Sequence, residues 1–139
     1  MITKKTAYAI RAVWELSQNP AQLRTASDIA EAQEIPPKYL PQIVSELVQC
    51  GLLSSTRGYK GGLRLKQNPE EISLLNIIEA IQGKIDMFEC LNGQVECKHL
   101  PDCDLQHVYR RAQDALVSVF AETRISDIHL GDLKRGPDA

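Results

Sequence analysis

The chain has 139 residues, of which 43% are hydrophobic, so it fits one packed domain or a small domain with an appended helix, and global disorder is excluded. No stretch approaches the roughly 20 apolar residues that span a bilayer, so no membrane partner is expected. The net charge of −2 combines +4 on residues 1–66 with −6 on residues 67–139. The basic N-terminal half could therefore bind a polyanion. Two ordinary solvated surfaces would have the same composition.

The first predicted element is a helix over residues 3–18. Its apolar side chains recur at helical spacing and form a broad face: Ala9, Ile10, Val13, Trp14 and Leu16. Charged Arg11 and Glu15 interrupt the apolar stretch, and no small-residue cleavage site follows, so the segment is not interpreted as a signal peptide. A cytoplasmic location is therefore expected, where stable disulfides are uncommon.

Two further helices are predicted next. Thr25 caps the first in a capping box with Asp28, and this helix ends before Ile35. The second begins at Pro37 and ends at Gly51. Pro41 is awkward inside it, because a proline there removes a backbone hydrogen bond or bends the first turn.

The helix that begins at Pro37 has two predicted faces. One is a buried apolar stripe, made of Leu40, Ile43, Val44, Leu47 and Val48. The opposite face is polar and carries Lys38, Gln42, Ser45 and Gln49. Cys50, at the end of this helix, is interpreted as a small structural hydrophobe.

A β-hairpin with a four- or five-residue loop is predicted between residues 52 and 65. Its two apolar pieces flank a tip that carries Arg57, Tyr59 and Lys60. Glycines at 58, 61 and 62 allow that tip to approach another surface closely.

This order of elements is that of a winged helix-turn-helix, so the predicted fold class is mainly α with a small β-hairpin wing. The third helix would enter a major groove and the wing would contact the backbone or the minor groove of double-stranded DNA. The candidate DNA-binding residues are Lys38, Tyr39, Gln42, Ser45, Gln49, Arg57, Gly58, Tyr59 and Lys60. The alternative is a helical domain with a merely solvated polar face, and the cations at the wing tip favour DNA.

Two more helices complete the prediction. Ser73 caps a fourth helix that ends at Gly83. A fifth helix runs from Asp104 to Thr123 and spans on the order of 30 Å, with a short helical turn possible after it. Its apolar stripe comprises Leu105, Val108, Tyr109, Ala112, Leu116, Val119 and Phe120. This length exceeds what so small a core needs, which predicts a dimerisation helix and a homodimer.

Three cysteines lie in a loop between the fourth and fifth helices. Six residues separate Cys90 from Cys97, and five separate Cys97 from Cys103, with His107 shortly after. Thiolates bind iron–sulfur clusters and zinc, but this spacing is not the CxxC pairing of zinc ribbons. Three alternatives to a metal or cluster site remain open: the thiols form a redox disulfide, they are reduced and have no role, or His107 only packs at the start of a helix.

The segments "KKTAYAIRAVWEL", "YLPQIVSELVQCGLLSSTRGYKGGLRL" and "CLNGQVECKHLPDC" resemble, in this order, bacterial regulators of the IscR/NsrR/RirA family. The resemblance extends from about residue 1 to residue 133. It implies a homodimeric winged-helix repressor or dual regulator whose long helices cross at the dimer interface. It also implies that Cys90, Cys97 and Cys103 bind a [2Fe-2S] or [4Fe-4S] cluster, with [2Fe-2S] favoured.

The sequence also departs from that family pattern. The first cysteine gap is one residue longer than in IscR and NsrR, and His107 follows the last cysteine at the fourth position, where IscR has its histidine at the third. NsrR-like proteins use an aspartate from the partner's first helix, and the matching residue is Ala7. The fourth ligand is therefore His107 first, then His99, Asp104 or Asp102. Pro41 stands where IscR has a glutamate in its recognition helix, so the operator sequence that IscR prefers is not expected for this chain.

These patterns predict a transcriptional repressor, not an enzyme, whose cluster senses redox state, iron, oxygen or nitric oxide. Residues 1–82 would form the DNA-binding domain, residues 83–104 the cluster loop, and residues 105–135 the dimerisation helix with a final turn. The hypothesis is that the cluster orders the loop and that the ordered loop shifts the fifth helix. In a dimer this shift would change the spacing of the two recognition helices, the third helix of each copy. The alternatives are a thiol switch or zinc on the same regulator, and a protein-interaction module with little DNA binding.

Overall fold

The computed structural model describes residues 1–91 and 103–131. In chain order the elements are α1 (Lys4–Ser17), α2 (Ala26–Gln33), the 3-10 turn η1 (Pro37–Tyr39), α3 (Leu40–Gln49), β1 (Leu53–Thr56), β2 (Gly62–Leu65), η2 (Pro69–Glu71), α4 (Leu74–Gln82), η3 (Glu89–Leu91), α5 (Asp104–Glu122) and η4 (Ile125–Asp127). The predicted class, mainly α with a β-hairpin wing and a long C-terminal helix, is confirmed. No helix in these two ranges is long and apolar enough to cross a membrane.

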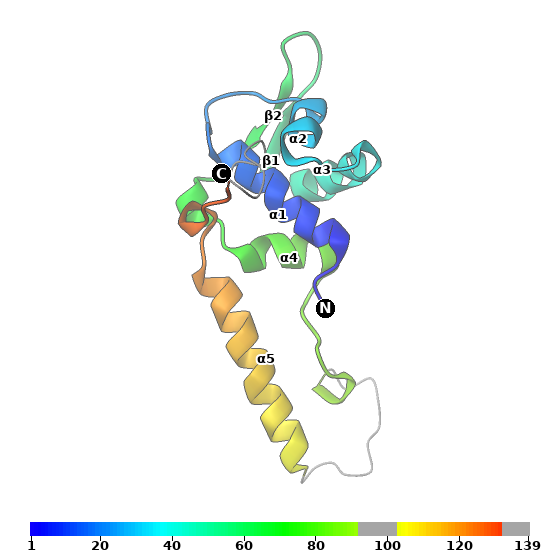
Figure 1. The fold of residues 1–139 in the computed structure, drawn as a ribbon, viewed down its shortest axis with the longest axis vertical. Coiled ribbons are helices and arrows are strands. Elements are labelled where there is room, and N and C mark those ends of the chain that lie inside the picture. The colour runs from blue at the N-terminus through cyan, green and yellow to red at the C-terminus, as the bar shows by residue number, and fades with distance from the viewer. Residues whose placement is uncertain (92–102, 132–139) are drawn as a thin grey trace.

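The core lies in the N-terminal part of the chain, where α1 packs against α2, α4 and the hairpin (Figure 1). Its centre is a set of fully buried side chains from α1, α2, α3 and α4: Ala9, Val13, Leu16, Ile29, Ile43, Leu47 and Ile77. Burial of each large aliphatic side chain contributes roughly 1.5–3 kcal/mol. Residues 1–82, called the winged part from here on, therefore form a core to which no buried side chain of α5 contributes.

Side-chain caps begin three of the helices: Thr3 caps α1, and the two caps that the sequence predicts begin α2 and α4. Thr25 and Asp28 form the predicted capping box of α2, with the Asp28 carboxylate accepting from the Thr25 backbone N–H at 3.0 Å. This backbone hydrogen bond, the Thr25 hydroxyl and nearby Arg24 lower the pKa of the Asp28 carboxyl from its ordinary value. Ser73 caps α4 with Asn76.

The start of α3 differs from the prediction and explains Pro41. Pro37 begins a 3-10 turn, and the α-helix itself begins at Leu40. Pro41 therefore lies in the first turn of α3, where its missing N–H has no helical partner to lose. The predicted apolar stripe is also narrower than expected, because Val48 is 36% exposed and Val44 is only half-buried.

The wing is an antiparallel hairpin in which Leu53 pairs with Leu65 and Thr56 with Gly62. Residues 57–61 form its tip, so the predicted loop length is confirmed. Gly61 is required there, because a Cβ atom would lie 2.1 Å from the Thr56 carbonyl oxygen. Arg24 adds a bridge to β2 through two backbone hydrogen bonds with Leu63, which holds the wing against the segment before α2.

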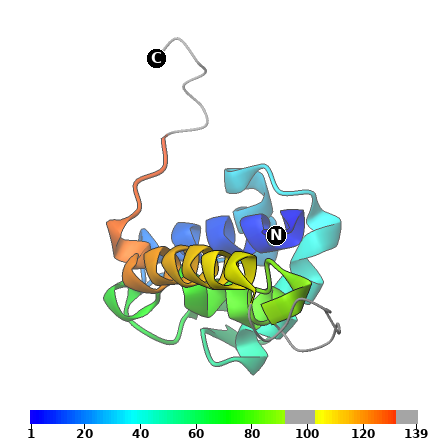
Figure 2. The ribbon, with the colours of Figure 1, turned by 90° about the horizontal axis from the view of Figure 1, so that it is seen from below.

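Helix α5 extends away from the winged part, at the end of the molecule opposite the wing tip (Figure 1). Its C-terminal end is anchored, since the Leu74 N–H donates to the Thr123 carbonyl and the Ile125 N–H donates to the Ile72 carbonyl. The short turn predicted after α5 is η4, where Ile125 is buried. Seen from below, α5 lies across α4 (Figure 2).

No side chain of α5 is fully buried, and its predicted apolar stripe divides into two faces. The inner face is half-buried and consists of Gln106, Tyr109, Gln113, Leu116, Val117 and Phe120. The outer face is exposed and consists of Leu105, Val108, Ala112, Ala115 and Val119. Leu105, Val108 and Val119 are 59%, 54% and 60% exposed, so this chain alone leaves an apolar seam on the helix uncovered.

Candidate nucleic-acid interface and cysteine site

Helix α3 and the turn before it carry the first group of predicted DNA-binding residues. Lys38, Gln42, Ser45 and Gln49 are all exposed on the polar face. Tyr39 is half-buried instead, with its ring 5.1 Å from that of Tyr8 and Lys38 Nζ 5.3 Å from its own ring centre. Its ring therefore fastens η1 to α1 in addition to any contact with DNA.

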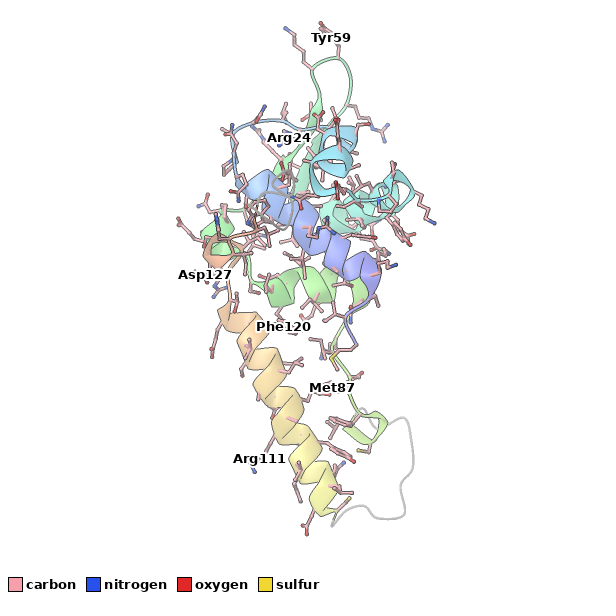
Figure 3. All side chains as sticks on the ribbon, in the orientation of Figure 1. Arg24, Tyr59, Met87, Arg111, Phe120 and Asp127 are labelled. Carbon is pink, nitrogen blue, oxygen red and sulfur yellow. The ribbon has the colours of Figure 1, made fainter. Side chains whose placement is uncertain are left out.

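The wing tip carries the second group: Arg57, Gly58, Tyr59 and Lys60, all exposed. Tyr59 is 95% exposed and points away from the body of the molecule (Figure 3). Lys60 Nζ lies 5.8 Å from the centre of its ring. Gly58 has a φ of 96°, a left-handed conformation that glycine adopts without strain.

A groove of about 380 Å³ lies between α3 and the hairpin, the elements that carry most of these residues. It is lined by residues of α2, α3 and the hairpin: Thr25, Ala26, Pro41, Val44, Ser55, Gly58, Gly61, Gly62 and Leu63. Glycines and small side chains keep it open between the wing and α3, the expected recognition helix. This arrangement suits a nucleic-acid backbone that passes between a helix in one groove and a wing in the next.

The structure also shows a polar network behind the recognition helix that the sequence analysis missed. Glu46 Oε1 accepts from Lys5 Nζ at 2.8 Å and from Gln42 Nε2 at 3.2 Å. The Gln42–Glu46 spacing of four residues is a signal for contact on one helix face. Lys5 comes from α1, 41 residues away, and no local pattern indicates that pair.

Cys90 and Cys103 lie at the far end of the molecule from the wing. Cys90 belongs to η3, Cys103 precedes the first residue of α5, and His107 lies in the first turn of α5. The Cys90 and Cys103 side chains are half-buried free thiols, whereas His107 is exposed. Cys97, together with the alternative ligands His99 and Asp102, lies outside the described residues.

Three contacts hold η3 and the residues before it against α5. Gln106 Nε2 donates to the Cys90 carbonyl at 3.0 Å, and the Met87 N–H donates to Gln113 Oε1 at 2.9 Å. The rings of Phe88 and Tyr109 stack with centroids 4.0 Å apart and planes 5° apart. Figure 3 shows Met87 beside the helix. We call these three contacts the η3–α5 clasp.

The clasp brings two cysteines to one end of α5. Gln106, which bonds the backbone of Cys90, lies three residues after Cys103, and the His107 backbone N–H donates to the Cys103 carbonyl at 3.3 Å. Thiolate and imidazole are suitable ligands for an iron–sulfur centre. Within residues 1–91 and 103–131 no three potential ligands converge, a set that omits Cys97.

Cys50 differs from its expected role, because its thiol is exposed and not packed as a small hydrophobe. Its Sγ lies 4.0 Å from the Ala80 carbonyl oxygen. The reason is that Cys50 follows the last turn of α3, past the buried positions Ile43 and Leu47.

Comparisons with known proteins agree with the winged-helix architecture. A family model described as "Rrf2: Iron-dependent Transcriptional regulator" matches residues 2–130. The chain is 34% identical to the transcriptional regulator IscR of Vibrio cholerae, over 95% of this chain and 73% of that protein. It is 30% identical to the regulator NsrR of Bacillus licheniformis, over 91% and 90%. The structure is also similar to that of CymR, the global cysteine regulator of B. subtilis, with a TM-score of 0.78 and 27% identity over 91% of this chain and 94% of that one.

Proposed function

The chain belongs to the Rrf2 family of DNA-binding transcriptional regulators, and from that premise we propose that it is a repressor whose DNA affinity is set by an iron–sulfur cluster. The observation that carries the proposal is the η3–α5 clasp, which brings Cys90 and Cys103 to one end of α5 as free thiols. The family relation supports a regulator and not an enzyme, acting in the cytoplasm.

Cys90, Cys97 and Cys103 would hold the cluster, preferentially [2Fe-2S], with His107 as the fourth ligand. When bound, such a cluster supplies a redox-active centre held by thiolates. His107 supports this assignment because it is exposed and its backbone N–H donates to the Cys103 carbonyl at 3.3 Å, within the first turn of α5. Ala7, at the position where NsrR-like proteins have an aspartate, has a methyl side chain with no donor atom for a cluster.

Helix α5 is suited to carry a change at the cysteine end to the winged part. At one end the clasp holds it beside Cys90. At the other end, the backbone bonds of Thr123 and Ile125 fix it to the segment before α4, and Trp14 Nε1 donates to the Ile128 carbonyl at 3.0 Å. A shift of α5 would therefore be felt by α4, which packs against α3, and by α1, which the Lys5–Glu46 ion pair connects to α3.

A homodimer is part of the proposal. The exposed apolar seam on α5 repeats at spacings of three and four residues, the pattern by which one helix packs along another. A second copy of α5 would cover Leu105, Val108 and Val119. Two recognition helices would then reach half-sites about one DNA turn apart. In this assignment residues 1–82 bind DNA, 83–104 hold the cluster, and 105–135 dimerise.

For the DNA interface we propose the exposed residues of α3, η1 and the wing tip described above. Lys38, Arg57 and Lys60 supply positive charge for phosphates. Gln42, Ser45 and Gln49 supply hydrogen-bonding groups for base edges. The groove between these two groups supports a backbone that passes between them.

Anaerobic purification followed by absorption spectroscopy, iron analysis and native mass spectrometry tests the cluster. We expect a coloured protein whose mass exceeds that of the chain by the mass of one cluster, and loss of colour and iron in Cys97→Ala. Cys50→Ala is the matched control, since Cys50 lies in the winged part, and it should keep both. A colourless, iron-free wild-type protein would contradict the proposal.

A thiol switch on the same regulator is the second candidate, favoured by the two half-buried free thiols Cys90 and Cys103. The same preparation distinguishes the two. A thiol switch predicts an iron-free protein in which mild oxidation forms a disulfide within residues 90–103, detectable by peptide mass spectrometry.

A further inference from the structure

We propose that Gln42 reads an adenine in the major groove and that Glu46 determines this choice by fixing the polarity of the Gln42 side-chain amide. The inference rests on the proposed placement of α3 in the major groove. It adds a specificity-determining residue, Glu46, that makes no contact with DNA itself.

Glu46 is held from behind the recognition helix. Its Oε1 atom lies 2.8 Å from Lys5 Nζ, and both side chains are about three-quarters buried, at 24% and 27% exposed. The other carboxylate oxygen, Oε2, is buried and accepts no hydrogen bond from any residue that the structure describes. The carboxylate is therefore fixed in place against α1, and its Oε1 atom is the one turned toward Gln42.

The chemistry of this contact determines which end of the Gln42 amide faces inward. A carboxylate paired with a lysine accepts hydrogen bonds and donates none. At 3.2 Å from Glu46 Oε1, the Gln42 atom must therefore be the Nε2 donor and not the carbonyl oxygen. The carbonyl oxygen then points away from Glu46, with the second amide N–H beside it.

An outward carbonyl next to an outward N–H matches one base edge. Adenine presents the N6 amino donor beside the N7 acceptor, which pair with the carbonyl and the N–H respectively. Guanine presents two acceptors, O6 and N7, so a fixed outward carbonyl would oppose O6. An amide that was free to turn could instead offer its donors to guanine, and the Glu46 contact prevents that rotation.

Selection of operators from a randomised DNA library, with the anaerobically purified full-length protein, tests the inference. Glu46→Gln keeps the size of the side chain but lets it donate as well as accept, so the Gln42 amide can turn. Gln42→Ala identifies the operator position that Gln42 reads. Glu31→Gln is the control, because it removes the same charge from an exposed position of α2.

We expect the position lost in Gln42→Ala to be an adenine that wild type prefers over guanine by about 5- to 150-fold. Glu46→Gln should reduce that preference to less than about threefold at this position alone, and Glu31→Gln should leave it intact. Purine, which lacks the N6 amino group, and 7-deazaadenine, which lacks N7, should each weaken wild-type binding when placed there.

Three outcomes would overturn the inference. The first is a Gln42-dependent position that is not adenine, the second is an unchanged adenine preference in Glu46→Gln, and the third is a selected operator that Gln42→Ala leaves intact. In each case wild type still selects an operator, so the proposed regulator stands. A wild-type protein that selects no sequence at all would overturn the regulator and the inference together.

Discussion

At the scale of single residues, carboxylates organise the DNA-binding half of the molecule. Glu46 joins α1 to the recognition helix, and Asp28 closes the first turn of α2. Asp28 was indicated by its spacing from Thr25, because a capping box is local. Lys5 and Glu46 were not, because their contact depends on how two separate helices pack.

Asp28 gives a pH-dependent prediction. The folded state lowers its pKa below the ordinary value of 3.8, through hydrogen bonds from Thr25, so its contribution to stability is present above that value and is lost as pH falls through the folded pKa. Asp28→Ala should therefore lower the melting temperature at pH 7, and the difference from wild type should shrink towards pH 3. Thermal unfolding across this range measures it.

Glu31→Ala is the control for Asp28→Ala, because Glu31 lies on the same helix outside the capping box. Its effect on the melting temperature should be small at every pH. A wild-type minus Asp28→Ala difference that stays constant from pH 7 to pH 3 would show that Asp28 does not act through its ionised carboxylate.

At the scale of elements, the sequence predicted the five α-helices and the hairpin, because periodic apolar residues and caps are local signals, but it did not predict the short 3-10 helices η2 and η3. It placed seven apolar residues of α5 in one stripe, however, since periodicity cannot tell which part of a stripe faces the chain's own core. Only packing divides it into the half-buried side with Tyr109 and the exposed side with Val108. The clasp was missed for the same reason: Gln106 and Gln113 are ordinary polar residues until η3 packs on them.

The clasp should hold Cys90 in place before any cluster is bound. Replacing both Gln106 and Gln113 by Ala removes two hydrogen bonds, each contributing about 0.5–1.5 kcal/mol. We expect the Met87 amide, which donates to Gln113, to exchange its hydrogen at least about tenfold faster, as measured by NMR. The cluster should also be lost to a chelator several-fold faster.

Asp114→Ala, at an exposed position of the same helix, should leave both rates unchanged. Unaltered exchange at Met87 in the double variant would mean that the clasp does not restrain η3. Faster exchange with an unaltered rate of cluster loss would mean that Cys90 does not need this restraint.

The outer face of α5 should be the dimer interface. Val108→Asp with Val119→Asp places two charges in the seam, where a second helix would bury them unpaired. Sedimentation equilibrium should show a dimer for wild type and a monomer for this variant, with DNA affinity reduced at least about 100-fold. Arg110→Asp, at an exposed position away from the seam, should remain dimeric. A double variant that stays dimeric would place the interface elsewhere.

At the scale of the whole molecule, the end proposed to bind DNA and the cysteine end lie far apart, and α5 extends from one toward the other (Figure 1). The wing and α3 occupy one end, and η3 with the first turn of α5 occupies the other. A sensor at the cysteine end can act on DNA only if α5 has two arrangements that the cluster distinguishes. The fourth ligand was not predictable, because His107 and the other candidates differ only in how the loop folds.

The most direct test of the account is the affinity of one anaerobic preparation for its selected operator, measured at fixed salt before and after the cluster is removed. The account predicts that removal changes Kd at least about fivefold, and that Cys97→Ala has the cluster-free Kd throughout. The same Kd with and without the cluster, in a protein shown by native mass spectrometry to bind one, would contradict it.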